Sequence, residues 1–191
     1  MLNDELFQVI NGFARHTPWL HGPAAAYSTM FGPLLLLGLL VAGWVIARGQ
    51  GPAVMAAAIW APFGTTLAVA LQRPIAEVAE QPMPSRSLPH TMTLVHGTAD
   101  MASPSAHAIL AGAVAAGLFL VERRLGVAAA VAGFLMGLAR VYVGLHYPSD
   151  ALAGLIVGAV VTMLGFMIVK PPLMALVTRL RRTPVRTLVA R

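Results

Sequence analysis

A few polar residues interrupt an otherwise apolar chain, and their types suit the binding and transfer of a phosphoryl group. The guanidinium of Arg140 presents a planar fork of N–H donors that matches phosphate oxygens and keeps its charge at any relevant pH. Pro104-Ser105-Ala106-His107 is expected to begin a helix, where free backbone N–H groups and the helix dipole attract an anion. His146 precedes Asp150 by four residues, so the carboxylate can hold one ring nitrogen while the other attacks phosphorus or transfers a proton. This chemistry needs neither a metal nor another cofactor.

Two further side chains extend this set. Arg73 offers a second guanidinium for phosphate, and His107 offers a second imidazole, which can protonate a leaving oxygen. Each residue also has an interpretation without a role in a site. Arg73 can be a flanking residue that snorkels to a membrane surface. His107 can be a histidine at the end of a span. The chain has no His-Glu-x-x-His spacing that would indicate a metal site.

The composition of the chain identifies lipid as its solvent. Of the 191 residues 58% are hydrophobic and 10% are charged, where a soluble domain carries about 25% charged residues. The absence of cysteine excludes disulfides, thiolate metal sites and cysteine nucleophiles. Lys and Arg outnumber Asp and Glu by 13 to 7, but six of the basic residues lie in the last 22 positions, after an apolar span. This placement indicates an anchor at a membrane surface and predicts no nucleic-acid partner.

The apolar segments predict an all-α integral membrane protein with a single domain over 1–191. A spanning helix needs about 20 mostly apolar residues. Five segments meet this length approximately, and the last is expected to end at Lys170-Pro171-Pro172: 22–47, 49–72, 103–121, 125–144 and 151–169.

An amphipathic helix is expected over residues 2–14, ahead of the spans. Apolar residues recur there at helical spacing, with Asp4 and Glu5 elsewhere on the helix: Leu2, Leu6, Ile10 and Phe13. Such a helix lies in the membrane surface and does not span it. The predicted architecture is therefore a bundle of about five transmembrane helices plus an N-terminal surface helix.

The distribution of basic residues predicts the orientation. Five spans place nine Lys and Arg residues on the side of the C-terminus and four on the other side. The positive-inside rule then makes 171–191 a basic cytoplasmic tail and 72–102 an outer loop. This topology places five polar residues near the outer boundary of the cell membrane: Arg73, His107, Arg140, His146 and Asp150.

The residues of these positions resemble the three signatures of the type-2 phosphatidic acid phosphatase superfamily, K-x6-R-P, P-S-G-H and S-R-x5-H-x3-D. The matching residues are Arg73-Pro74, then Pro104-Ser105-Ala106-His107, then Arg140, His146 and Asp150. The resemblance covers about 70–170. Within the superfamily the chain looks most like the bacitracin-resistance type of undecaprenyl diphosphate phosphatase.

The resemblance implies a role for each matching residue. His146 would be the nucleophile that becomes phosphorylated, Asp150 would orient it, and His107 would be the general acid for the leaving group. The phosphoryl oxygens would be bound by Arg73, Arg140 and Ser105.

The chain departs from the family pattern at three positions. Thr66 replaces the lysine of the first signature, Ala106 the glycine of the second, and Ala139 the serine of the third. The first and third changes remove possible phosphate contacts. The 29 residues of 75–103 also form a long insert without an assigned role.

The implied function is hydrolysis of a polyprenyl diphosphate, of the undecaprenyl type, to the monophosphate and phosphate through a phosphohistidine. This would recycle the carrier lipid of cell-wall synthesis, with a lipid phosphate and membrane lipid as the partners. The alternatives within the enzyme class are phosphatases for phosphatidylglycerophosphate, phosphatidic acid or a prenyl-phospho-sugar. An alternative of another class is a transporter that uses the intramembrane His, Arg and Asp residues as an ion path.

Overall fold

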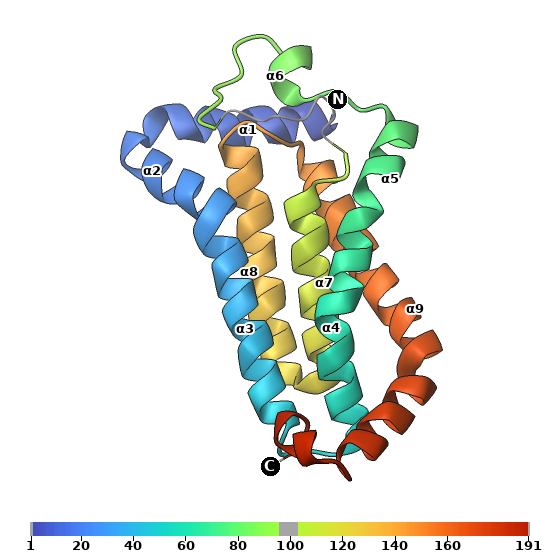
Figure 1. Cartoon of the computed structure of the whole chain (residues 1–191). Helices are drawn as coiled ribbons and strands as arrows, with labels where there is room; N and C mark the ends of the chain where they lie inside the picture. The colour runs from blue at the N-terminus through green and yellow to red at the C-terminus, as the bar shows by residue number, and fades with distance from the viewer. Residues whose placement is uncertain (1, 96–102, 191) are drawn as a thin grey trace.

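Long apolar helices stand side by side in the computed structural model, which describes residues 2–95 and 103–190, and one amphipathic helix lies across their upper end (Figure 1). Four helical columns are long and apolar enough to cross a membrane: 18–47, 52–79, 123–142 and 148–180. The first column consists of α2 (Pro18–Ala26), a π-helical turn η1 (Tyr27–Phe31) and α3 (Gly32–Ala47). The second consists of α4 (Pro52–Ala70) and α5 (Gln72–Ala79), and the last two are α8 (Arg123–Tyr142) and α9 (Pro148–Leu180).

The fifth predicted span is the shorter apolar helix α7 (Ala106–Val121), which lies in the middle of the bundle (Figure 1). Most of its residues are buried, and many are alanine or glycine. Small residues let α7 and α9 approach closely: a Cβ atom added to Gly112 would lie 2.1 Å from the carbonyl oxygen of Leu155, and one added to Gly158 would lie 2.0 Å from that of Ile109. The predicted all-α membrane bundle is confirmed.

The segment predicted as an outer loop, 72–102, contains helical structure. After a break at Leu71 the chain continues as α5, in whose first turn Pro74 is tolerated because no intrahelical donor is needed there. A short helix α6 (Pro84–Ser87) follows, and the backbone N–H of Leu94 donates to Val143 O at 3.0 Å. Part of the insert is thus folded onto the start of the turn between α8 and α9. Residues 96–102 of the predicted loop lie outside the described residues.

The last helix does not end where the sequence predicted. α9 continues through Pro171 and Pro172 to Leu180 and bends back across the lower end of the bundle (Figure 1). Prolines remove backbone donors and kink a helix, and here the chain tolerates them because the last turns gain packing. Val177, together with Val189 after the 3₁₀ turn η2 (Pro184–Leu188), is buried in a cluster with residues of the α3–α4 end. The segment predicted as a basic tail is therefore largely a folded cap on this end of the bundle.

The helix predicted over 2–14 is α1 (Leu2–His16), which lies across the upper end of the bundle (Figure 1). Its exposed apolar side chains include Leu2, Leu6 and Phe13. Asn11, on the opposite side, is 3% exposed. Its Nδ2 donates to Met92 O at 2.8 Å and its Oδ1 accepts from Met92 N at 2.9 Å. α1 is therefore amphipathic and is also tied to the insert by the buried Asn11 side chain.

Candidate active site

The turn between α8 and α9 presents the nucleophile candidate. Arg140 lies in the last turn of α8, His146 in the turn, and Asp150 in the first turn of α9. Gly144 allows the reversal, because it has φ +85° and an added Cβ atom would lie 2.3 Å from Met92 O. The five residues between Arg140 and His146 thus reverse the direction of the chain, and the two side chains lie next to each other.

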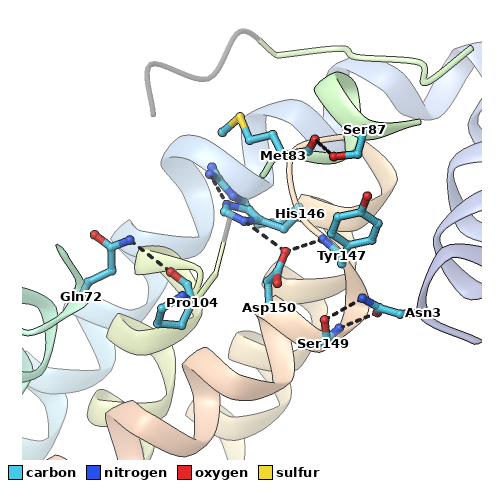
Figure 2. Close-up of polar contacts among 10 residues, drawn as sticks. Asn3, Gln72, Met83, Ser87, Pro104, His146, Tyr147, Ser149 and Asp150 are labelled. Carbon is cyan, nitrogen blue, oxygen red and sulfur yellow. Dashed lines mark hydrogen bonds and ion pairs between the residues drawn. The ribbon is translucent and has the colours of Figure 1, made fainter. Parts of the chain in front are cut away.

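Asp150 and His146 are adjacent and almost completely buried, with 0% and 5% exposure (Figure 2). Oδ2 of Asp150 lies 4.0 Å from Nδ1 of His146 and accepts a hydrogen bond from the backbone N–H of Tyr147 at 2.7 Å. The hydrogen bond from Tyr147 is half of a capping box: Asp150 is the third residue of α9, and its carboxylate accepts from the backbone N–H of the residue before the helix. The start of α9 therefore fixes the carboxylate beside the imidazole.

The other nitrogen of His146 faces Arg140. Nη2 of Arg140 lies 3.0 Å from Nε2 of His146. Because a guanidinium has donors only, Nε2 must be the acceptor, and Nδ1 carries the hydrogen of the neutral ring toward Asp150. In this tautomer Nε2 holds the lone pair, so it is the ring nitrogen that could act as a nucleophile.

The beginning of α7 completes the cluster. The backbone N–H of Ser105 donates to Asp150 O at 3.2 Å, which places the first turns of α7 and α9 together. Ser105 is fully buried, and its Oγ and the Nε of Arg140 have no hydrogen-bond partner among the described residues. His107 lies half-buried in the same turn of α7, within electrostatic reach of Arg140. Buried donors without partners are costly, and phosphoryl oxygens have the acceptor chemistry that would satisfy both.

Arg73 is the one predicted site residue that the structure does not bring into this cluster. Its side chain is 88% exposed, and its Nε pairs with Glu77 Oε1 at 3.4 Å one turn along α5. Thr66, at the position of the family's lysine, is exposed and donates to Pro62 O within α4. The phosphate-binding role of Arg73 remains a prediction.

A family model for the PAP2 superfamily matches residues 57–172, which include all six predicted site residues. The chain belongs to this superfamily. The resemblance predicted from the three signatures is confirmed, and the protein is an integral membrane phosphatase of this class.

Two curated relatives and two solved structures are similar to this PAP2 phosphatase over most of its length. Undecaprenyl-diphosphatase BcrC of Bacillus subtilis (strain 168) is 27% identical over 166 residues, which are 86% of this chain and 83% of the relative. Bacitracin transport permease protein BcrC of Bacillus licheniformis is 26% identical over 165 residues, covering 86% and 79%.

The two structures share the fold. Aquifex aeolicus LpxE superposes with a TM-score of 0.62 and 24% identity, covering 87% of this chain and 96% of LpxE. A transmembrane PAP2 type phosphatidylglycerolphosphate phosphatase from Bacillus subtilis superposes with a TM-score of 0.61 and 20% identity, covering 86% and 85%.

Sequence reasoning missed two contacts that support the site of this PAP2 phosphatase (Figure 2). Nε2 of Gln72 donates to Pro104 O at 3.2 Å and thereby ties the start of α5 to the segment that begins α7. Asn3 of α1 exchanges two hydrogen bonds with Ser149 of α9. Gln72 could have been singled out as the neighbour of Arg73, whereas nothing in the sequence links positions 146 residues apart.

Proposed function

We propose that this PAP2 phosphatase hydrolyses a polyprenyl diphosphate, of the undecaprenyl type, to the monophosphate and inorganic phosphate. The observation that carries the proposal is the buried junction in which His146 lies between Arg140 and Asp150, beside the start of α7. The substrate class is supported by the name of the Bacillus subtilis relative, undecaprenyl-diphosphatase, which aligns with 86% of the chain.

The first step would form a phosphohistidine. Nε2 of His146 attacks the terminal phosphorus, and the bond from that phosphorus to the bridging oxygen breaks, with its electron pair passing to the bridging oxygen. Protonated His107 gives its proton to this oxygen, and the prenyl monophosphate leaves. Arg140 turns its donors from Nε2 to the phosphoryl oxygens, which releases the lone pair for attack. The phosphorylated ring is cationic, and the Asp150 carboxylate beside Nδ1 stabilises it.

The second step would return the enzyme to its starting state. Water attacks the phosphohistidine phosphorus, neutral His107 accepts a proton from the water, and the P–N bond breaks with its electron pair returning to Nε2. Inorganic phosphate leaves. Every proton and bond is accounted for by His146, His107, water and the substrate.

The proposed setting is the outer face of the cell membrane, where the reaction would recycle the carrier lipid of cell-wall synthesis. The support for the orientation is the excess of basic residues at the end of the chain opposite the site. The same site chemistry would serve another lipid phosphate, and the second of the two similar structures is that of a phosphatidylglycerolphosphate phosphatase. The name of the Bacillus licheniformis relative describes bacitracin transport, a function of another class.

Phosphate release by the detergent-purified protein separates these possibilities. The substrates are a polyprenyl diphosphate, phosphatidylglycerophosphate, phosphatidic acid and a prenyl-phospho-sugar whose sugar carries a terminal phosphate, with His146→Gln as the matched control. We expect the highest kcat/KM on the polyprenyl diphosphate and no turnover by the variant. A higher kcat/KM on one of the other lipids would contradict the proposed substrate and would leave the phosphatase activity in place. Failure of the wild type to hydrolyse any of them would favour transport.

A further inference from the structure

The N-terminal helix α1 makes a direct contact with the helix turn that carries Asp150. Nδ2 of Asn3 donates to Ser149 Oγ at 2.8 Å, and the backbone N–H of Ser149 donates to Asn3 Oδ1 at 3.1 Å. Figure 2 shows this pair of hydrogen bonds one residue away from Asp150. The two residues are 146 positions apart in the chain, so the contact is a product of the tertiary fold.

The contact meets a specific need of α9. The first N–H groups of a helix have no acceptor within it, and the side chain of the preceding residue usually supplies one. Tyr147 occupies that position, and tyrosine is not among the residues that cap helices well. Pro148 has no N–H, and the N–H of Asp150 donates to Tyr147 O at 3.1 Å. Asn3 therefore provides from α1 the acceptor that the N–H of Ser149 requires.

Two other contacts hold α1 against the end of α8 and the start of α9. The rings of Phe7 and Tyr147 lie 5.4 Å apart between centroids, and Nδ2 of Asn11 donates to Tyr142 O at 3.2 Å. These anchors lie before His146, at Tyr142, and after it, at Tyr147 and Ser149. α1 thus spans the segment that contains the nucleophile candidate, from the end of α8 to the start of α9.

We infer that Asn3 is a positioning residue for phosphoryl transfer, which holds the first turn of α9 so that the Asp150 carboxylate stays beside Nδ1 of His146. The inference rests on the proposed phosphohistidine function. Asn3 does not touch His146, so its effect passes through Ser149 and the backbone of α9. Reaction rates fall steeply when reacting groups move by about 1 Å, which makes such a support visible in kcat.

The test compares three variants of the full-length protein in detergent. Asn3→Ala removes both hydrogen bonds, and we expect kcat to fall about tenfold with KM within about twofold of the wild type. Asn3→Asp keeps an acceptor for the Ser149 N–H, and its second oxygen can accept from the Ser149 hydroxyl, so we expect it to restore most of kcat. Gln8→Ala changes an exposed residue of the same helix and should leave both constants unchanged.

Single-turnover formation of phosphohistidine and the thermal unfolding midpoint are measured on the same samples. A slower phosphorylation step in Asn3→Ala, with rescue by Asn3→Asp and an unchanged midpoint, would support the positioning role. A wild-type kcat in Asn3→Ala would overturn it, as would a loss explained by unfolded protein or by KM alone. Because each variant is compared with the wild type on whichever lipid phosphate is hydrolysed, a change of substrate does not affect the outcome. Retained activity in His146→Gln would instead overturn the phosphohistidine mechanism and the inference with it.

Discussion

Arg140 and His146 form a pair in which one residue sets the state of the other. The Arg140 guanidinium, 3.0 Å from Nε2, can only donate to a lone pair, and so it favours the neutral ring that can attack phosphorus. The Asp150 carboxylate faces the opposite nitrogen and favours a hydrogen there. The two charged neighbours thus select the same tautomer from opposite sides of the ring. A phosphoryl group that draws the guanidinium onto its oxygens would expose Nε2 at the moment of binding.

His107 gives the first prediction at the scale of single residues. If His107 protonates the leaving oxygen, its removal should matter more for a poor leaving group than for a good one. A lipid monophosphate leaves as an alkoxide with a high pKa and needs the proton strongly, whereas a diphosphate leaves as a phosphate monoester and needs it less. His107→Ala should therefore lose about 10²-fold or more in kcat on lipid monophosphates and less on diphosphates.

Initial rates of His107→Ala and the wild type on one monophosphate and one diphosphate of the same lipid provide the measurement. Single-turnover kinetics confirm that chemistry limits both reactions. Equal losses on the two substrates would contradict the role of proton donor and make His107 a residue that binds phosphate.

Most of the candidate site could be predicted from residue spacing, because short motifs place their side chains through local geometry. The five residues from His146 to Asp150 form one turn, and the Asp150 carboxylate reaches back to accept from the N–H of Tyr147. Arg73 shows the limit of this reasoning. Its motif position is clear, but the direction of its side chain depends on α5 and on Glu77 one turn away.

At the scale of helices, the close approach of α7 and α9 holds the two halves of the site together. The contact between Ser105 N and Asp150 O lies where the two helices begin, beside the candidate site. Below it, Gly158 packs directly against the backbone of α7, where an added Cβ atom would lie 2.0 Å from Ile109 O. Backbone atoms cannot move aside as a flexible side chain can, so the helices themselves would have to separate.

Gly158→Ala is therefore expected to destabilise the protein by about 1–3 kcal/mol and to lower kcat, although alanine favours helices. The matched control is Gly38→Ala in α3, where nothing lies within 4 Å of the added Cβ atom. That change should be neutral or stabilising by about 0.5–1 kcal/mol. Thermal unfolding in detergent and kcat for both variants give the comparison. An equal effect of the two substitutions would show that the α7–α9 contact does not depend on this glycine.

The helices themselves could be predicted because apolar runs of sufficient length have few other stable forms in lipid. Their ends could not, since these depend on contacts made elsewhere in the chain. Pro171 and Pro172 signalled a terminus, yet α9 continues to Leu180 because Val177 is buried against the α3–α4 end. The insert likewise gave no sign that Met92 would bind Asn11 of α1.

At the scale of the whole molecule, the site and the basic C-terminal segment lie at opposite ends of the bundle (Figure 1). α9 runs the length of the bundle, with Asp150 in its first turn and Arg179 in its last. The two ends therefore differ in charge, and one of them carries the candidate site. From this difference in charge the positive-inside rule predicts the orientation in the membrane. The end with Arg179 should face the cytoplasm, and the end with Asp150 should face outward.

Cysteine labelling tests this orientation without background, because the chain has no cysteine of its own. Ser85→Cys, on the exposed surface of α6, is a near-isosteric change at the end of the bundle that carries the site. Thr187→Cys places a thiol on the exposed surface of η2 at the opposite end. A membrane-impermeant maleimide should label the first variant in intact cells and the second only after permeabilisation. The reverse pattern would place His146 and its neighbours on the cytoplasmic side, and the enzyme would then act on lipid phosphates made on the inner face of the membrane.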